Sequence, residues 1–142
     1  MKYSKGAMTR EKGFQGQKWS ILGEPYVPLH MTPSSLLLDA EFGPNSFVPT
    51  HIHETQDEIL YILEGEMDFD MEGETIKAGP GTAVTLPKGI PHSLHNRSGK
   101  LVKALVMVSP TGDFYDYMTK ISGLADPAEV VRLGPEHGIR FV

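Results

Sequence analysis

Short segments in which polar and apolar residues alternate fill the middle of this 142-residue chain. Within residues 35–42 every second residue is apolar, and the same alternation recurs in residues 66–71. A period of two indicates a strand with one buried face. Glu72-Gly73 follows the second of these segments directly, and this dipeptide predicts a hairpin turn. The chain is therefore expected to fold largely from short antiparallel strands.

Further short apolar segments separated by Gly, Pro and Asn extend this pattern. The expected strands cover residues 58–63, 74–77, 82–86, 92–96 and 101–108. Many short strands with turn residues between them are typical of a β-sandwich or a β-barrel. We therefore predict one mostly β domain, a small antiparallel β-barrel, over residues 18–110.

The two ends of the chain follow other patterns. Residues 1–17 are polar and rich in glycine, which predicts a flexible N-terminal arm. Within residues 111–142 the apolar spacing becomes helical, and Asp126 followed by Pro127 is a typical helix start. We expect this tail to form two short helices packed on the barrel, the second ending at Gly134-Pro135.

Composition excludes several classes of function. The net charge is −5 with no basic stripe, so the sequence predicts no nucleic-acid partner. No segment approaches the roughly 20 apolar residues that span a bilayer, and the N-terminus lacks the apolar core of a secretory signal. Cysteine is absent, which excludes disulfides and thiolate ligands. The expected location is cytoplasmic.

The segment PTHIHETQDEILYILEG places two histidines one residue apart before an acidic pair. On a strand His51 and His53 share a face, and Glu58 begins the next strand, so it can fold back beside them. His92 opens a distant strand that an antiparallel barrel can bring next to His53. Three nitrogens and one oxygen suit a divalent transition metal. An isolated H-x-H pair is more often a surface or core feature, and we assign no role to His30, His95 or His137.

Two spaced motifs make the chain resemble the cupins. Their first motif contains a glycine, H-x-H, an acidic residue after three or four positions, and a glycine after six more. This chain has His51, His53, Glu58 and Gly65, with Asn45 in place of the opening glycine; asparagine also tolerates a positive φ. The second motif is matched at every spacing by Gly81, Pro87, Gly89, His92 and Asn96. The resemblance covers about residues 25–110.

The resemblance implies a cupin jelly roll with a metal inside, held by His51, His53, Glu58 and His92. The metal would be one divalent ion per chain, either Ni, Fe, Mn, Co or Zn. Glu58 fits the motif better than Asp57, because only Glu58 leaves six residues before Gly65.

The overall layout resembles single-domain cupins of the quercetin 2,3-dioxygenase-like group. In such enzymes the metal holds an enolate oxygen, and the ligand glutamate takes the substrate's proton before dioxygen opens the ring. The resemblance therefore implies that Glu58 is both ligand and catalytic base for a small aromatic or enolic substrate. A lyase or isomerase using the same metal, or a cupin that binds a small molecule without turnover, remains an alternative.

Two further expectations concern surfaces. We expect Met67, Phe69, Leu105, Met107 and Phe114 to line an apolar substrate pocket as a group, although core packing is the simpler explanation for each strand residue taken alone. Aromatic residues of the tail helix could cover the barrel mouth or attach the helix to the outside of the sheet.

The outward-facing side of the expected sheet is unusually apolar, with Leu37, Ile59, Tyr61 and Leu63. Such a face predicts a homodimer.

Overall fold

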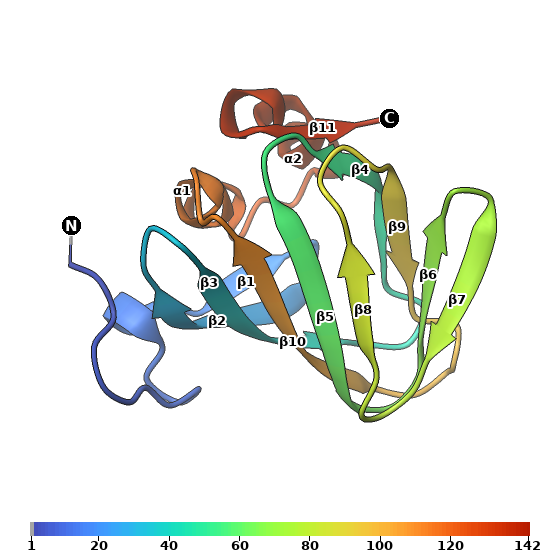
Figure 1. Ribbon diagram of the computed structural model, residues 1–142, viewed down its shortest axis with the longest axis horizontal. Coiled ribbons are helices and arrows are strands. Elements are labelled where there is room, and N and C mark those ends of the chain that lie inside the picture. Colours follow the sequence, from blue (N-terminus) through green and yellow to red (C-terminus); the bar gives the residue numbers. More distant parts are fainter. Residues whose placement is uncertain (1) are drawn as a thin grey trace.

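The computed structural model describes residues 2–142 as two antiparallel sheets that face each other (Figure 1). The larger sheet has the order β1 (Trp19–Ile21), β2 (Glu24–Met31), β3 (Leu36–Phe42), β10 (Val102–Ser109), β5 (Asp57–Glu64) and β8 (Ala83–Leu86). The smaller sheet has the order β11 (Ile139–Phe141), β4 (Phe47–His53), β9 (His92–His95), β6 (Met67–Met71) and β7 (Glu74–Ala78). The core lies between the two sheets.

The predicted alternation appears as burial in β3 and β10. Leu38 pairs with Val106 and Ala40 pairs with Ala104, and all four side chains are buried. The residues between them are only partly buried because they point away from the core. The apolar face of each strand is thus removed from water, which is the main stabilising contribution of this packing.

The prediction of a mostly β fold with short C-terminal helices is confirmed, but the predicted closed barrel is not. Among residues 2–142 the strand pairing forms two separate sheets, with no ladder joining one to the other. The inner faces still enclose a common interior, as in a jelly roll.

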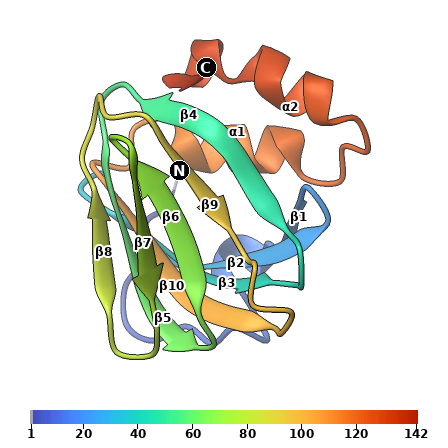
Figure 2. The ribbon, with the colours of Figure 1, turned by 90° about the vertical axis from the view of Figure 1, so that its right-hand side faces the viewer.

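The C-terminal tail begins with α1 (Phe114–Ile121) and α2 (Pro127–Leu133). Asp126 caps α2 as predicted, because its carboxylate accepts a hydrogen bond of 2.9 Å from the backbone N–H of Ala128. Figure 2 shows both helices at one end of the sheets, beside β4. A single 3₁₀ turn (Pro135–His137) then leads into β11.

Strand β11 corrects the prediction of a purely helical tail. Its three residues pair antiparallel with β4, Ile139 opposite His53 and Phe141 opposite His51. The tail therefore completes the smaller sheet at the strand that carries two of the predicted ligands.

The N-terminal segment is attached to the domain at several points, contrary to the expected loose arm. The backbone N–H of Ser4 donates to the carbonyl of Met31 at 2.8 Å, and Arg10 pairs with Glu41. Phe14, in the 3₁₀ turn Phe14–Gly16, is buried in the core, where its ring packs edge-on against the ring of Tyr115. Met1, which belongs to the same predicted arm, lies outside the described residues.

Neither described helix has the length and apolar character needed to cross a membrane.

Candidate metal centre

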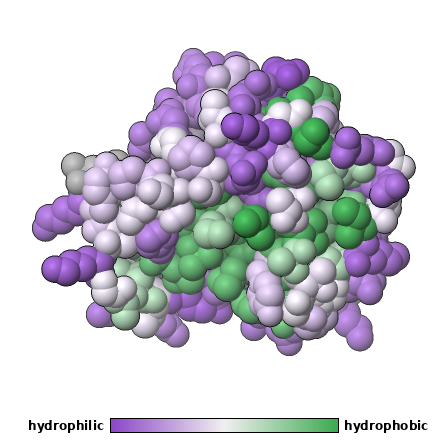
Figure 3. All heavy atoms as spheres, in the orientation of Figure 1, coloured by the Kyte–Doolittle hydropathy of each residue, from purple (hydrophilic) through white to green (hydrophobic). Residues whose placement is uncertain are grey.

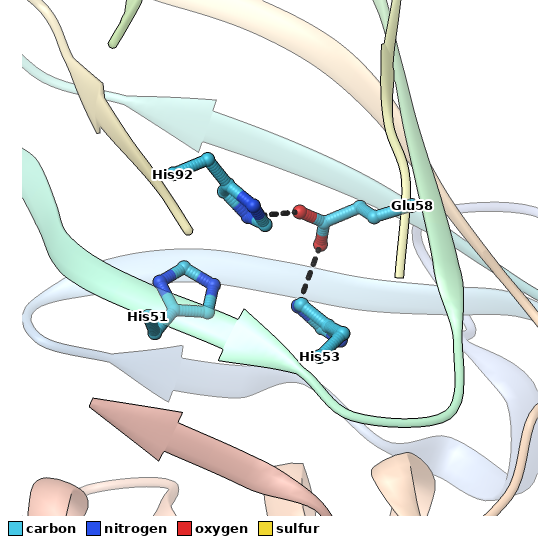
Figure 4. A group of neighbouring side chains, drawn as sticks. All are labelled: His51, His53, Glu58 and His92. Atoms are coloured by element: carbon cyan, nitrogen blue, oxygen red, sulfur yellow. Dashed lines mark ion pairs between the residues drawn. The ribbon is translucent and has the colours of Figure 1, made fainter. Parts of the chain in front are cut away.

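Four buried side chains from three strands converge between the sheets, as Figure 4 shows. His51 and His53 lie on β4, and alternation points both into the interior. His92 begins β9 and is paired directly opposite His51. Glu58 comes from β5 in the other sheet, so it approaches the histidines across the core. One potential ligand atom from each residue lies within 4.8 Å of all the others.

The carboxylate of Glu58 lies between two of the imidazoles. Its Oε1 is 3.2 Å from Nε2 of His92, and its Oε2 is 3.7 Å from Nε2 of His53. The rings of His51 and His92 are inclined to each other by 64°, with centroids 4.4 Å apart. All four predicted ligands are therefore brought together by the structure.

Backbone carbonyls accept hydrogen bonds from the Nδ1 side of two imidazoles. Nδ1 of His51 lies 2.8 Å from the carbonyl oxygen of Pro49, and Nδ1 of His92 lies 3.3 Å from that of Ile90. A carbonyl oxygen can only accept a hydrogen bond, so Nδ1 of His51 carries the proton and its Nε2 presents a lone pair inward. Nδ1 of His92 can hold its proton in the same way once its Nε2, which faces the carboxylate of Glu58, binds a cation.

The orientation of the Gln56 side-chain amide determines the tautomer of the third imidazole, His53. Nε2 of Gln56 donates to the carbonyls of Pro110 and Thr111, at 2.9 and 2.6 Å. The amide oxygen must then face His53, whose Nδ1 is 3.1 Å away. His53 therefore also carries its proton on Nδ1 and turns the lone pair of Nε2 inward.

This donor set fits a metal ion. Nε2 of His92 is buried and, apart from the carboxylate of Glu58 at 3.2 Å, has no polar partner among the described residues. Leaving a buried acceptor unsatisfied is unfavourable, and a cation at the centre of the four groups would satisfy it. Three inward lone pairs and one carboxylate match the nitrogen and oxygen ligands of divalent transition metals.

Local electrostatics keep two of the ligands, His51 and Glu58, in the protonation states that metal binding requires. Burial, followed by the proximity of His92, lowers the pKa of His51 to about 4, so its imidazole is neutral at pH 7. Burial alone would raise the pKa of Glu58, but the neighbouring His53 and His92 hold it below the ordinary value. At neutral pH the site thus contains a carboxylate and a neutral His51.

An apolar cavity of about 70 Å³ adjoins this cluster. Its wall includes His51, His53 and Glu58 together with residues of β2, β3, β10 and both C-terminal helices. The apolar and aromatic lining residues include Tyr26, Leu38, Leu60, Val106, Phe114, Tyr117, Met118, Ile121, Val130, Ile139 and Phe141.

Of the five residues predicted to form the substrate pocket, Phe114 lines this cavity and the other four do not. Met67 and Phe69 are completely buried elsewhere in the core. Leu105 and Met107 alternate with the inward-facing Val106 and are only partly buried, so they lie on the outer face of β10. The pocket prediction is corrected at these four positions.

Helix α1 both covers the cavity and attaches to the sheet. Phe114 and Tyr117 both line the cavity, and the ring centroid of Phe114 is 5.4 Å from that of His53. Tyr115 points the other way, with its ring 5.1 Å from that of Trp19. The two roles left open by the sequence are therefore divided between two faces of one helix.

Sequence reasoning missed the contribution of Tyr26 to the cavity wall. Its strand contains Pro25 and Pro28, which obscure the alternation. Tyr26 is buried, and its row of the sheet continues through Ala40 and Ala104, whose small side chains leave room for the ring. Burial, followed by the charge of Glu58, raises its pKa, so the phenol stays protonated.

The three histidines assigned no role lie outside the cluster. His30 contacts Ser35, His95 lies 3.3 Å from Asp70, and His137 pairs with Asp113. His95 points away from His92 because they stand on opposite faces of β9.

Comparison with known proteins agrees with this geometry. A family model described as the cupin domain matches residues 38–108, which is half of the chain. The chain belongs to the cupin family. The matched region contains all four residues of the cluster.

Among solved structures, an RmlC-like cupin from Shewanella frigidimarina superposes with a TM-score of 0.70 at 16% identity, covering 81% of this chain and 99% of that one. The DMSP lyase DddQ from Ruegeria pomeroyi is 30% identical with a TM-score of 0.51, covering 57% of this chain and 41% of that one.

A curated relative, the tetracenomycin polyketide synthase protein TcmJ from Streptomyces glaucescens, is 28% identical over 86 residues. The alignment covers 56% of this cupin and 58% of TcmJ, so this cupin spans little more than half of that relative.

Proposed function

We propose that this cupin is a metal-dependent enzyme, a dioxygenase acting on a small aromatic or enolic molecule. The observation that carries the proposal is the buried group of three histidines and one glutamate at the wall of an apolar cavity. Apolar walls with a few converging polar groups are typical of small-molecule sites. The sequence resemblance to quercetin 2,3-dioxygenase-like cupins supports this class of reaction.

His51, His53, Glu58 and His92 would hold one divalent ion per chain. The ion would supply Lewis-acid polarisation of a substrate oxygen and a site for dioxygen chemistry. Nickel, iron, manganese, cobalt and zinc all accept three nitrogens and one oxygen.

The protein's own groups would handle the substrate proton. Glu58 is ionised and can accept the hydroxyl proton of an enolic substrate through one of its two oxygens. Tyr26 lines the cavity, and its protonated phenol can donate to a substrate oxygen there. The apolar lining would exclude water from the reacting groups.

The size of the cavity limits how a substrate can bind. Its volume of about 70 Å³ is less than half of the ~150 Å³ that accommodates benzene in an engineered protein cavity. A wider hollow of about 650 Å³ lies outside it, and Leu22, Glu24, Ser46 and Phe47 line both spaces. An aromatic substrate would therefore extend through this mouth, or α1 would move to enlarge the inner space.

A lyase or isomerase is the second candidate, because Glu58 and Tyr26 could form an acid–base pair without dioxygen. The similarity to a DMSP lyase supports this alternative. A cupin that binds its ligand without turnover is the third.

Oxygen uptake tests the proposal. The metal-free protein would be loaded separately with each of the five metals and mixed with flavonols and small diketones. A dioxygenase consumes one dioxygen per substrate with at least one metal. Substrate loss without oxygen uptake would favour the lyase or isomerase, and tight binding without substrate loss would favour the third candidate.

A further inference from the structure

Gln56 connects a metal-site histidine to the start of the helix that covers the cavity. It lies in the turn between β4 and β5 and is buried, although glutamine is usually exposed. Its amide oxygen faces Nδ1 of His53, and its amide nitrogen donates to the carbonyls of Pro110 and Thr111. The side chain thus joins segments more than 50 residues apart in the sequence.

Both ends of this amide have a defined chemical task. The end near His53 must be an acceptor, since the two carbonyls use the donor end, and only an acceptor keeps the proton of His53 on Nδ1. The end near residues 110–111 holds the backbone that leads directly into α1, which begins at Phe114. Thr111 is further held by a hydrogen bond from its hydroxyl to the carbonyl of Thr32.

Phe114 provides a second contact between helix α1 and His53. Its ring lies 5.4 Å from His53, and the same helix contributes Tyr117, Met118 and Ile121 to the cavity wall. Moving the segment before α1 would therefore pull on Gln56 and disturb the imidazole it orients. Conversely, a metal that holds His53 would steady the same segment.

We propose that Gln56 is a positioning residue that sets the tautomer of His53. Through its hydrogen bonds the orientation of His53 in the metal site and the position of helix α1 over the cavity depend on each other. The inference rests on the proposed metal site but not on the type of reaction. Metal binding would thereby stabilise α1 in its position over the cavity, and loss of the metal would make α1 more mobile.

The main test replaces Gln56 by Met, which keeps the length of the side chain and removes all three hydrogen bonds. We expect Gln56→Met to bind Co²⁺ about 10- to 100-fold more weakly in a chelator-competition titration, as is typical when a partner of a metal-bound histidine is lost. The visible absorption bands of the Co²⁺ form should also shift. Amide exchange of residues 114–121, slowed by Co²⁺ in the wild type, should no longer respond to the metal.

A second variant separates the two ends of the amide. Gln56→Glu keeps an acceptor for Nδ1 of His53 but places a carboxylate oxygen against two carbonyls. It should therefore bind Co²⁺ at least as tightly as the wild type while amide exchange in residues 114–121 becomes faster. If Gln56→Met proves too unstable to titrate, the Gln56→Glu result decides alone.

Gln15→Met is the matched control, because Gln15 accepts a hydrogen bond of 2.8 Å from Tyr115 on the opposite face of α1. It should leave Co²⁺ affinity and the Co²⁺ spectrum unchanged. Wild-type affinity and spectrum in Gln56→Met, or equally weak metal binding in Gln15→Met, would overturn the proposal. So would a Gln56→Glu protein that exchanges like the wild type. A wild type that binds metal but consumes no oxygen would instead refute only the dioxygenase.

Discussion

Phe141 lies directly opposite His51 in the pairing of β11 with β4, with the two rings 5.4 Å apart. The last strand of the chain thus supports the strand that carries two of the four candidate ligands. The backbone N–H of Val142 extends this support by donating to the carbonyl of Thr50 at 3.0 Å. The candidate metal centre, far from residues 139–142 in sequence, is therefore packed against them.

Replacing Phe141 by Ala tests this support. The ring is partly buried against the core, so its loss should lower the free energy of unfolding by about 2 kcal/mol, below the cost of emptying a fully buried site. Metal affinity should fall several-fold because His51 loses a neighbouring ring. Urea denaturation and metal titration measure both effects. Val142→Ala is the control, because Val142 is 64% exposed, and a similar loss there would contradict the assignment.

The candidate ligands could be predicted because their positions depend on strand alternation and on two spaced motifs. His51, His53 and Glu58 are separated by one short turn, so their convergence follows from local geometry. Asn45, which replaces the expected glycine, has the positive φ of 66° that such a turn requires. The turn is therefore kept although the motif residue has changed.

The pocket residues were mispredicted because alternation does not say which face of a strand is inside. In β10 the inward Val106 and the outward Leu105 and Met107 are all apolar. A shift of one residue exchanges the two faces, and here hydrophobicity does not decide between them. The three residues of β11 are too few to show a period, so that strand could not be predicted either.

The ligand assignment predicts which histidines a metal requires. His51→Ala and His92→Ala should lose most of the bound metal, because each removes one of three inward nitrogen donors. His95→Ala and His137→Ala should keep it, since those rings contact Asp70 and Asp113 outside the cluster. Elemental analysis of protein purified without chelators measures the content. Full occupancy in His92→Ala would refute the site.

Acid should destabilise the metal-free protein through His51. Its pKa is about 4 in the folded protein and 6.5 for an ordinary histidine, so the unfolded chain binds the proton more readily. Keeping His51 neutral therefore contributes fully to the free energy of unfolding above pH 6.5. As the pH falls toward 4 this contribution is lost, which lowers the free energy of unfolding by about 3 kcal/mol. Glu58, whose pKa is also lowered, acts in the same direction at lower pH.

Urea denaturation with a chelator, repeated from pH 7 to pH 4, measures this loss. His51→Gln cannot take up the proton and should lose about 3 kcal/mol less than the wild type over the same range. Parallel pH profiles for the two proteins would show that another group is responsible.

The outer face of the larger sheet carries an apolar patch, and we propose that this patch pairs with a second copy of the chain. Figure 3 shows apolar residues gathered over β10 and β5. Tyr61 lies beside Leu105 and Ile59 beside Met107, with Tyr61 42% and Leu63 46% exposed. Ion pairs of Arg10 with Asp39 and Lys103 with Glu64 flank this face. An apolar centre with a charged rim is the usual anatomy of a dimer interface.

Light scattering at micromolar concentration should therefore report a dimer. Leu105→Glu should convert it to a folded monomer, because a charge would be buried at the centre of the interface. Val131→Glu places the same charge on an exposed position of α2 and should leave the dimer intact. A monomeric wild type would refute the proposal.

Glu58→Gln separates the two roles proposed for this residue. The amide keeps an oxygen donor of similar size, and three histidines remain, so part of the metal should be retained. Turnover should fall by about 100- to 10,000-fold, as is typical when a general base is lost. The loss should be smaller for substrates already ionised at the assay pH, because they need no base. Comparing oxygen uptake of metal-loaded wild type and variant on neutral and ionised substrates measures this difference. A variant with full metal and a near-normal rate on a neutral hydroxyl substrate would leave Glu58 as a ligand only.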